Sequence, residues 1–236
     1  MIHTGFQATA LGQAIDTVNA MIKWRLSDEP LEKEDEEAFK DPAVREKTRA
    51  TIFLGYTSNM ASCGMREYIC YLCQHGMIST IVTTTGGIEE DIMKLLAHHY
   101  IGDFSLDGKT LRNQGLNRLG NLIVPNNNYT LLESWFKPLV EQMHKEQNDQ
   151  GKFFTPSEII SRIGQKMEDD KLPNREESIY YWCYKNNIPV FCPAFTDGAL
   201  GDVMYFDSFN NPGFIVDINA DLRKLNDIAR VAKKSG

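Results

Sequence analysis

The chain has 236 residues, of which 42% are hydrophobic and 24% charged, and its formal net charge is −7. This size and composition are typical of one globular domain of mixed α/β type. The negative charge excludes broad nucleic-acid binding, which needs a basic surface, and it favours a cationic substrate. We find no apolar run of about 18 residues that would span a membrane and no signal-peptide pattern, so we expect a cytoplasmic protein.

An acidic stretch follows the first predicted helix. Apolar residues recur at three- and four-residue steps over residues 8–26, which predicts an amphipathic helix. Residues 27–48 then contain nine acidic and four basic side chains and two prolines. This composition predicts an acidic flexible insertion at 27–48, with a functional acidic segment as the alternative.

From there on, short apolar runs alternate with amphipathic segments. The runs predict strands at residues 51–56, 80–84, 121–125, 189–193 and 213–218. The amphipathic segments predict helices at residues 62–75, 88–98, 130–147, 155–167, 177–186 and 219–233. Gly86 and Gly87 are interpreted as a turn before the second of these helices, and residues 126–128 as another turn.

This alternation predicts an α/β fold, with a Rossmann-like open parallel sheet covered by helices on both faces. We expect a single domain over residues 1–236. A helix with no strand after it closes the chain, although a helix in this fold normally leads into another strand. The pattern therefore predicts that C-terminal strands are missing, and it leaves open a partner chain or an end of the sheet.

The five cysteines predict no disulfide framework. An odd number without a signal peptide indicates reduced cytosolic thiols. Cys70 and Cys73 form a C-x-x-C pair, but the pair lies in an apolar helical pattern without a second pair or a suitably spaced histidine. We interpret these residues as packing thiols and predict no metal site, with metal or redox chemistry as the alternative.

Small, polar and acidic residues follow the predicted strands. In an open parallel sheet, ligands bind beyond the carboxyl ends of the strands. Residues 57–59, 84–91 and 196–202 would meet there, and they include the carboxylates of Glu89, Glu90, Asp91, Asp197 and Asp202. Such a cluster suits a polyamine or a divalent metal ion, and a hydride-accepting cofactor beside an amine is a coherent pairing.

Simpler explanations exist for each of these features. Acidic residues at a helix start are favoured by the helix dipole alone, and paired glycines make a turn. The chain has neither of the common glycine-rich nucleotide fingerprints. His75, His98 and His99 are assigned to helix ends, where an imidazole is favoured by the dipole, and are interpreted as structural.

Five blocks of the sequence resemble motifs of the deoxyhypusine synthase family, in the order of that family. They are residues 4–9, 51–59, 82–91, 117–126 and 193–202. The resemblance implies a transferase that uses NAD to oxidise spermidine and passes its aminobutyl group, through an imine on an enzyme lysine, to one lysine of the precursor of translation factor 5A. This is the first step of hypusine formation. It also implies a tetramer.

The resemblance assigns ligand contacts position by position. The implied NAD contacts are Ser58, Asn59, Met60, Ala61, Ser62, Thr84, Thr85, Gly86, Glu90 and Asp197. The implied spermidine contacts are Glu89, Glu90 and Asp202.

Three features of the family have no counterpart in this sequence: a glycine-rich strand and turn, a histidine that contacts the substrate, and the segment with the catalytic lysine. The family carries its catalytic lysine in a Trp-Gly-Lys segment, whereas Trp24, Trp135 and Trp182 are followed by other residues. We therefore assign no catalytic residue. The alternatives are an active transferase chain, a non-catalytic paralogue or fragment within a hetero-oligomeric synthase, and a simple NAD-dependent oxidoreductase or amine-binding domain. The last would need a Tyr-Lys or His-Asp pair near the strand ends, and the sequence offers none there.

Overall fold

The computed structural model describes residues 1–33 and 35–232. The chain folds into two compact units. The first contains Met1–Phe53 and the residues from Arg223 onward, and the second contains Leu54–Leu222. Helix α11 (Ile218–Val231) runs from the second unit into the first. A single domain over residues 1–236 stays a prediction. No helix of the described residues is both long and apolar enough to cross a membrane.

The first unit contains the acidic stretch, which adopts short helices. Its elements are α1 (Phe6–Lys23), η1 (Leu26–Asp28), η2 (Glu37–Phe39) and α2 (Pro42–Lys47). The guanidinium of Arg45 is buried among them and donates to the carbonyls of Leu26 and Glu29 at 2.8 and 2.7 Å. It also lies 3.3 Å from the Asp35 carboxylate. The stretch thus has a local fold around one arginine, and its flexibility stays a prediction.

A three-stranded sheet forms the centre of the second unit. Its strands are β1 (Phe53–Gly55), β2 (Thr80–Val82) and β6 (Val190–Phe191), in the order β1-β2-β6. β2 and β6 are parallel, with Ile81 opposite Val190. Both of these side chains are buried, as expected for a sheet covered by helices. The prediction of an α/β fold with a parallel sheet is confirmed.

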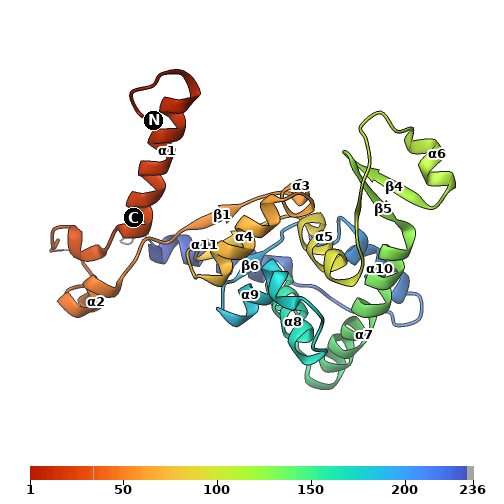
Figure 1. The fold of residues 1–236 in the computed structure, drawn as a ribbon. Coiled ribbons are helices and arrows are strands. Elements are labelled where there is room, and N and C mark those ends of the chain that lie inside the picture. Colours follow the sequence, from red (N-terminus) through yellow and green to blue (C-terminus); the bar gives the residue numbers. More distant parts are fainter. Residues whose placement is uncertain (34, 233–236) are drawn as a thin grey trace. The chain divides into compact units, whose positions relative to one another are not determined.

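Helices make up most of the rest of this unit (Figure 1). They are α3 (Ser58–Ser62), α4 (Met65–Gln74), α5 (Thr85–Leu96), α6 (Gly108–Asn113), α7 (Asn126–Gln150), α8 (Pro156–Asp169), η3 (Arg175–Glu177), α9 (Ile179–Lys185) and α10 (Ala199–Asp207). α8 begins with the predicted capping box, in which Thr155 and Glu158 each accept from the other's backbone N–H.

Residues 121–125 do not join the parallel sheet, so that prediction was wrong. Strand β5 (Leu122–Pro125) instead pairs antiparallel with β4 (Leu116–Leu119) and with β3 (Tyr100–Ile101). Gly120, at φ +62, lies in the two-residue connection between β4 and β5. Such a tight turn returns the chain beside the strand it has just left, which gives an antiparallel hairpin. The hairpin projects from the rest of the unit (Figure 1).

The predicted strand at 213–218 is also absent from the described residues. Only Val216 forms a bridge, parallel to Phe154, and α11 begins at Ile218. One bridge leaves the neighbouring backbone groups without a ladder, so a continuous apolar run alone does not make a strand.

Two predicted turns are the first turns of helices. α5 begins at Thr85, so it includes Gly86 and Gly87, and α7 begins at Asn126. Gly87 is needed for space, because a Cβ built there would lie 2.5 Å from the Thr83 Oγ1. Pro125 is the N-cap of α7, so the three asparagines that were interpreted as a turn belong to the first turn of this helix.

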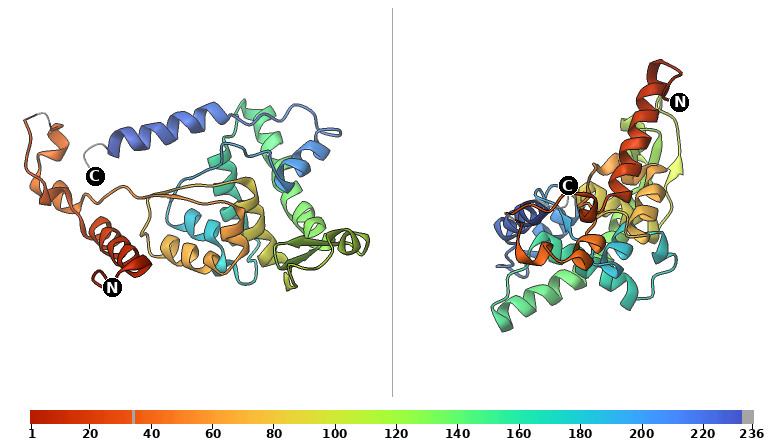
Figure 2. Two further views of the ribbon diagram at one scale, coloured as in Figure 1. Left: turned by 90° about the horizontal axis from the view of Figure 1, so that it is seen from above. Right: turned by 90° about the vertical axis from the view of Figure 1, so that its left-hand side faces the viewer.

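A glycine allows α8 and α9 to pack closely, side by side (Figure 2). A Cβ built on Gly164 would lie 2.5 Å from both the Tyr180 carbonyl oxygen and the Tyr184 Cβ. We expect Gly164→Ala to lower the free energy of unfolding by about 1–3 kcal/mol, because the two helices must separate. Urea unfolding measures this loss. The matched control is Gly108→Ala, where no atom lies within 4 Å; equal stability of the two variants would contradict the prediction.

Candidate functional site

The carboxyl ends of the three sheet strands lead to all the predicted site residues. β1 leads into α3, β2 into α5, and β6 into a loop and α10. The second unit therefore brings residues 58–62, 84–90 and 197–202 to one end of its sheet, as expected for a parallel sheet.

The first turn of α5 lies against α3. A Cβ built on Gly86 would lie 2.8 Å from the Ser58 Cβ, so only glycine permits this approach. Thr84 at the N-cap makes no side-chain capping bond, and the first turn of α5 contains no acidic side chain. Backbone N–H groups at such a helix start suit an anion such as a phosphate.

The residues of α3 differ in accessibility. Ala61 and Ser62 are buried, Ser58 and Met60 are half-buried, and Asn59 is exposed. The Ser62 hydroxyl donates to the Ser58 carbonyl oxygen at 3.1 Å. Of the five, Asn59 therefore has the side chain most accessible to a ligand, whereas Ala61 mainly sets the packing of α3.

Glu89 joins α5 to α10. Its Oε2 accepts from the Leu200 N–H at 3.3 Å, and a Cβ built on Gly198 would lie 2.7 Å from this same oxygen. Burial raises the pKa of Glu89 to about 7. The backbone N–H groups of Leu200 and Ala199 oppose this effect, because they lower the pKa by donating to the carboxylate. The negative charges of Glu90 and Asp202 raise this pKa further. Glu89 is therefore a carboxyl group that changes its protonation near neutral pH.

Glu90 is more enclosed than Glu89. Its side chain is 7% exposed, and burial raises its pKa. A hydrogen bond from Ser62 and the positive charge of Lys94 lower this pKa in part. The Lys94 ammonium itself donates to the Ser62 carbonyl oxygen. Tyr129, in the first turn of α7, has a pKa raised by burial and by the charges of Glu90 and Glu89. The sequence analysis missed Tyr129, although it follows three asparagines that end a predicted strand.

His99 was assigned to a helix end, but α5 ends at Leu96. The imidazole is buried instead, with its Nδ1 3.6 Å from the Glu90 Oε2. Burial lowers the pKa of His99 to about 4, and the positive charges of Lys94 and Arg66 lower it further. No pattern in the sequence indicates this position.

Asp91 turns away from the carboxylates beside it in sequence. It is fully buried and lies 2.7 Å from the Arg66 Nε, while the Ser178 hydroxyl donates to it at 2.6 Å and the Ile179 N–H at 3.2 Å. These groups occupy both of its oxygens, so Asp91 stabilises the fold and does not offer a free charge to a ligand.

Asp197 and Asp202 are both exposed. Burial raises the pKa of the Cys192 thiol, at the end of β6, to about 11, and the charges of Glu89 and Asp197 contribute to this shift. Asp197 therefore lies near Cys192. Asp202 lines a cavity of about 410 Å³ together with Thr196, Tyr205 and Asp207. Of the predicted ligand contacts, Asp202 therefore lines this cavity, whereas the contacts on α3 and α5 do not.

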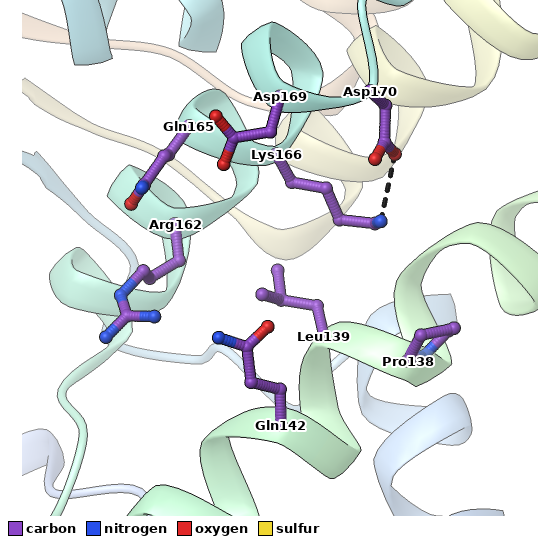
Figure 3. A pocket seen from close by; sticks show the side chains of 8 residues that line it. All are labelled: Pro138, Leu139, Gln142, Arg162, Gln165, Lys166, Asp169 and Asp170. Carbon is purple, nitrogen blue, oxygen red and sulfur yellow. Dashed lines mark ion pairs between the residues drawn. The ribbon is translucent and has the colours of Figure 1, made fainter.

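A second cavity, of about 200 Å³, lies between α7 and α8 and contains none of the predicted site residues (Figure 3). Its cations are already paired. Lys166 lies 2.9 Å from Asp170, and Arg162 lies 2.7 Å from Glu146. Both cations that line this cavity are therefore compensated, and Asp169 adds a further carboxylate to its lining.

Four of the five cysteines are buried, and Cys63 is exposed. The Cys183 and Cys73 sulfur atoms lie 3.7 Å apart, and burial raises the pKa of Cys183 well above its usual value. Such thiols are unreactive, which agrees with packing. Within residues 1–33 and 35–232, no group of three or more His, Cys, Asp or Glu side chains is arranged to hold a metal ion.

Comparisons with known proteins relate the whole chain to one enzyme family. The family model for deoxyhypusine synthase matches residues 1–236. A relative from Dictyostelium discoideum, assigned as a deoxyhypusine synthase, is 53% identical over 232 residues, which are 98% of this chain and 59% of the relative. Homospermidine synthase 2 of Senecio vernalis is 52% identical over 232 residues, which are 97% of this chain and 60% of that relative.

A solved structure agrees with these sequence matches. The crystal structure of a protein from Entamoeba histolytica, assigned as a deoxyhypusine synthase, superposes with a TM-score of 0.71 at 32% identity. The superposition covers 96% of this chain and 67% of that one. The chain thus spans about 60% of the length of the curated relatives it matches.

Proposed function

The chain belongs to the deoxyhypusine synthase family, and from this we propose that it serves the NAD-dependent transfer of the aminobutyl group of spermidine to a lysine of translation factor 5A. One observation carries the proposal beyond family membership. Glu89 and Glu90, with raised pKa values, lie beside an uncapped helix start at the ends of three strands. These features support a cation site next to an anion site.

The helix start of α5 fits a dinucleotide. Gly86 lets α5 and α3 approach closely, and the N–H groups of the first turn suit a pyrophosphate. Residues 58–62, 84–86, Glu90 and Asp197 would hold the cofactor. NAD, when bound, supplies the hydride acceptor that oxidation of an amine carbon needs.

The carboxylates fit a polyamine. Glu89, Glu90 and Asp202 would pair with its ammonium groups, and the partial burial of Glu89 and Glu90 strengthens their pairs relative to pairs in water. Because the pKa of Glu89 is about 7, its carboxylate also suits accepting a proton from an amine nitrogen near neutral pH. We assign no lysine of this chain to the covalent step.

NAD binding tests the cofactor half of the proposal. We expect Gly86→Ala to weaken NAD binding about tenfold, because the new Cβ forces α5 away from Ser58. Calorimetric titration with NAD measures this change. The matched control is Gly64→Ala, where no atom lies within 4 Å, and it should bind NAD as the unchanged chain does. Equal affinity of both variants would place the cofactor elsewhere.

The acceptor of the aminobutyl group needs a separate test. The similarity to a homospermidine synthase favours a second candidate, transfer to a free diamine. We would incubate the chain with NAD and labelled spermidine, adding either translation factor 5A or butane-1,4-diamine. Label on the protein supports the first candidate, and labelled homospermidine supports the second. Transfer that needs an added longer relative would make this chain a subunit of a hetero-oligomer.

A further inference from the structure

A buried histidine and a buried glutamate face each other behind the proposed amine site. The side chains of His99 and Glu90 are 4% and 7% exposed, and Nδ1 lies 3.6 Å from Oε2. Neither ring nitrogen of His99 has a hydrogen-bond partner in the described part of the chain, and neither has this Glu90 oxygen. Three buried polar atoms thus lack partners at one place, which is costly unless they serve each other.

Charged side chains from the neighbouring elements surround His99 and Glu90. Lys94 and Arg66 face it as cations, and Arg66 is held by Asp91. Glu89 and Tyr129 lie close enough to Glu90 for its charge to raise their pKa values. Burial lowers the pKa of His99, and the two cations lower it further, so the imidazole is neutral at neutral pH and only one of its nitrogens carries a proton.

We propose that His99 is a positioning residue for Glu90. A small rotation of the imidazole shortens the 3.6 Å separation, so that Nδ1–H donates to Oε2 of Glu90 and the other carboxylate oxygen is directed toward the ammonium group of the substrate. The inference rests on the proposed function in one respect, the assignment of Glu90 to the amine. The imidazole touches neither substrate nor cofactor, and it acts only through the orientation of this carboxylate.

The tautomer of His99 tests the contact without any ligand. The chain has five histidines, so ring-¹⁵N histidine labelling gives few signals, and His99→Asn identifies the one required. We expect the shifts of a neutral ring protonated at Nδ1, which move in Glu90→Gln. A ring protonated at Nε2, or shifts unchanged in Glu90→Gln, would overturn the proposal.

Spermidine affinity tests the consequence of this contact. His99→Asn keeps a donor near the position of Nδ1, whereas His99→Gln places its amide nearer Nε2. We expect His99→Leu and His99→Gln to weaken spermidine binding about fivefold to tenfold, and His99→Asn to restore it to within about twofold. The matched control is His98→Leu, at the exposed neighbouring histidine. Equal losses in the Asn, Gln and Leu variants would reduce His99 to packing.

The two measurements separate the inference from the proposed function. If the unchanged chain does not bind spermidine, the amine assignment fails, while the tautomer still decides whether His99 orients Glu90. If spermidine binds and the tautomer is Nε2–H, the proposed function stands and the positioning role fails.

Discussion

Asp91→Ala is expected to lower the free energy of unfolding by about 3–5 kcal/mol, because it breaks a buried ion pair by removing one partner. The Asp91 side chain is fully buried and that of Arg66 is 10% exposed. Without the carboxylate, the Arg66 guanidinium, the Ser178 hydroxyl and the Ile179 N–H lose their acceptor together. This carboxylate links α5, α4 and the start of α9, so the loss affects three elements.

Chemical denaturation of the purified chain at pH 7 measures this loss. Glu133→Ala is the matched control, since it removes an exposed carboxylate from α7 and should change little. A cost for Asp91→Ala as small as that of the control would show that Arg66 finds another acceptor.

Glu89→Gln should do the opposite and stabilise the chain above pH 7. The folded state raises the pKa of Glu89 from 4.5 to about 7, so it binds more protons than the unfolded state between these values. Stability therefore falls as the pH rises through this window. The shift corresponds to an upper bound of about 3 kcal/mol at pH 8, which a neutral glutamine does not lose. Glutamine also keeps an oxygen that accepts from Leu200.

The same substitution should weaken spermidine binding, because it removes a carboxylate from the proposed amine site. Denaturation at pH 4.5 and pH 8 measures the first effect, and calorimetric titration with spermidine measures the second. Glu133→Gln, at an exposed position, should change neither. A Glu89→Gln chain that is less stable than the unchanged chain at pH 8 would mean that Glu89 is ionised at no cost in the folded state.

Local patterns of the chain predicted the parts of the site that depend on neighbours in sequence. Thr155 and Glu158 form their capping box because both partners lie within one helical turn. Residues 58–62 and 84–90 follow strands in the chain, so a parallel sheet necessarily carries them to one end. The family blocks assigned ligand contacts on these same residues, and those contacts stay predictions.

The sequence patterns did not predict which strands pair with each other when the partners are distant in the chain. The apolar run at 121–125 is a strand, but no pattern within it determines whether its partner is the central sheet or a hairpin neighbour. Residues 213–218 are equally apolar and form only one bridge. Register and partner are decided by long-range backbone hydrogen bonds, which a single run of residues does not encode.

The carboxylates divide in the same way between sequence and fold. The sequence by itself determined that acidic side chains lie in the helix after the second strand, and that small residues let the backbone come close there. Only the tertiary structure decided that Asp91 binds Arg66, that Glu89 accepts from the Leu200 N–H, and that His99 lies against Glu90. Successive helical residues point about 100° apart, so the elements packed around α5 determine whether each charge is neutralised, buried or left available.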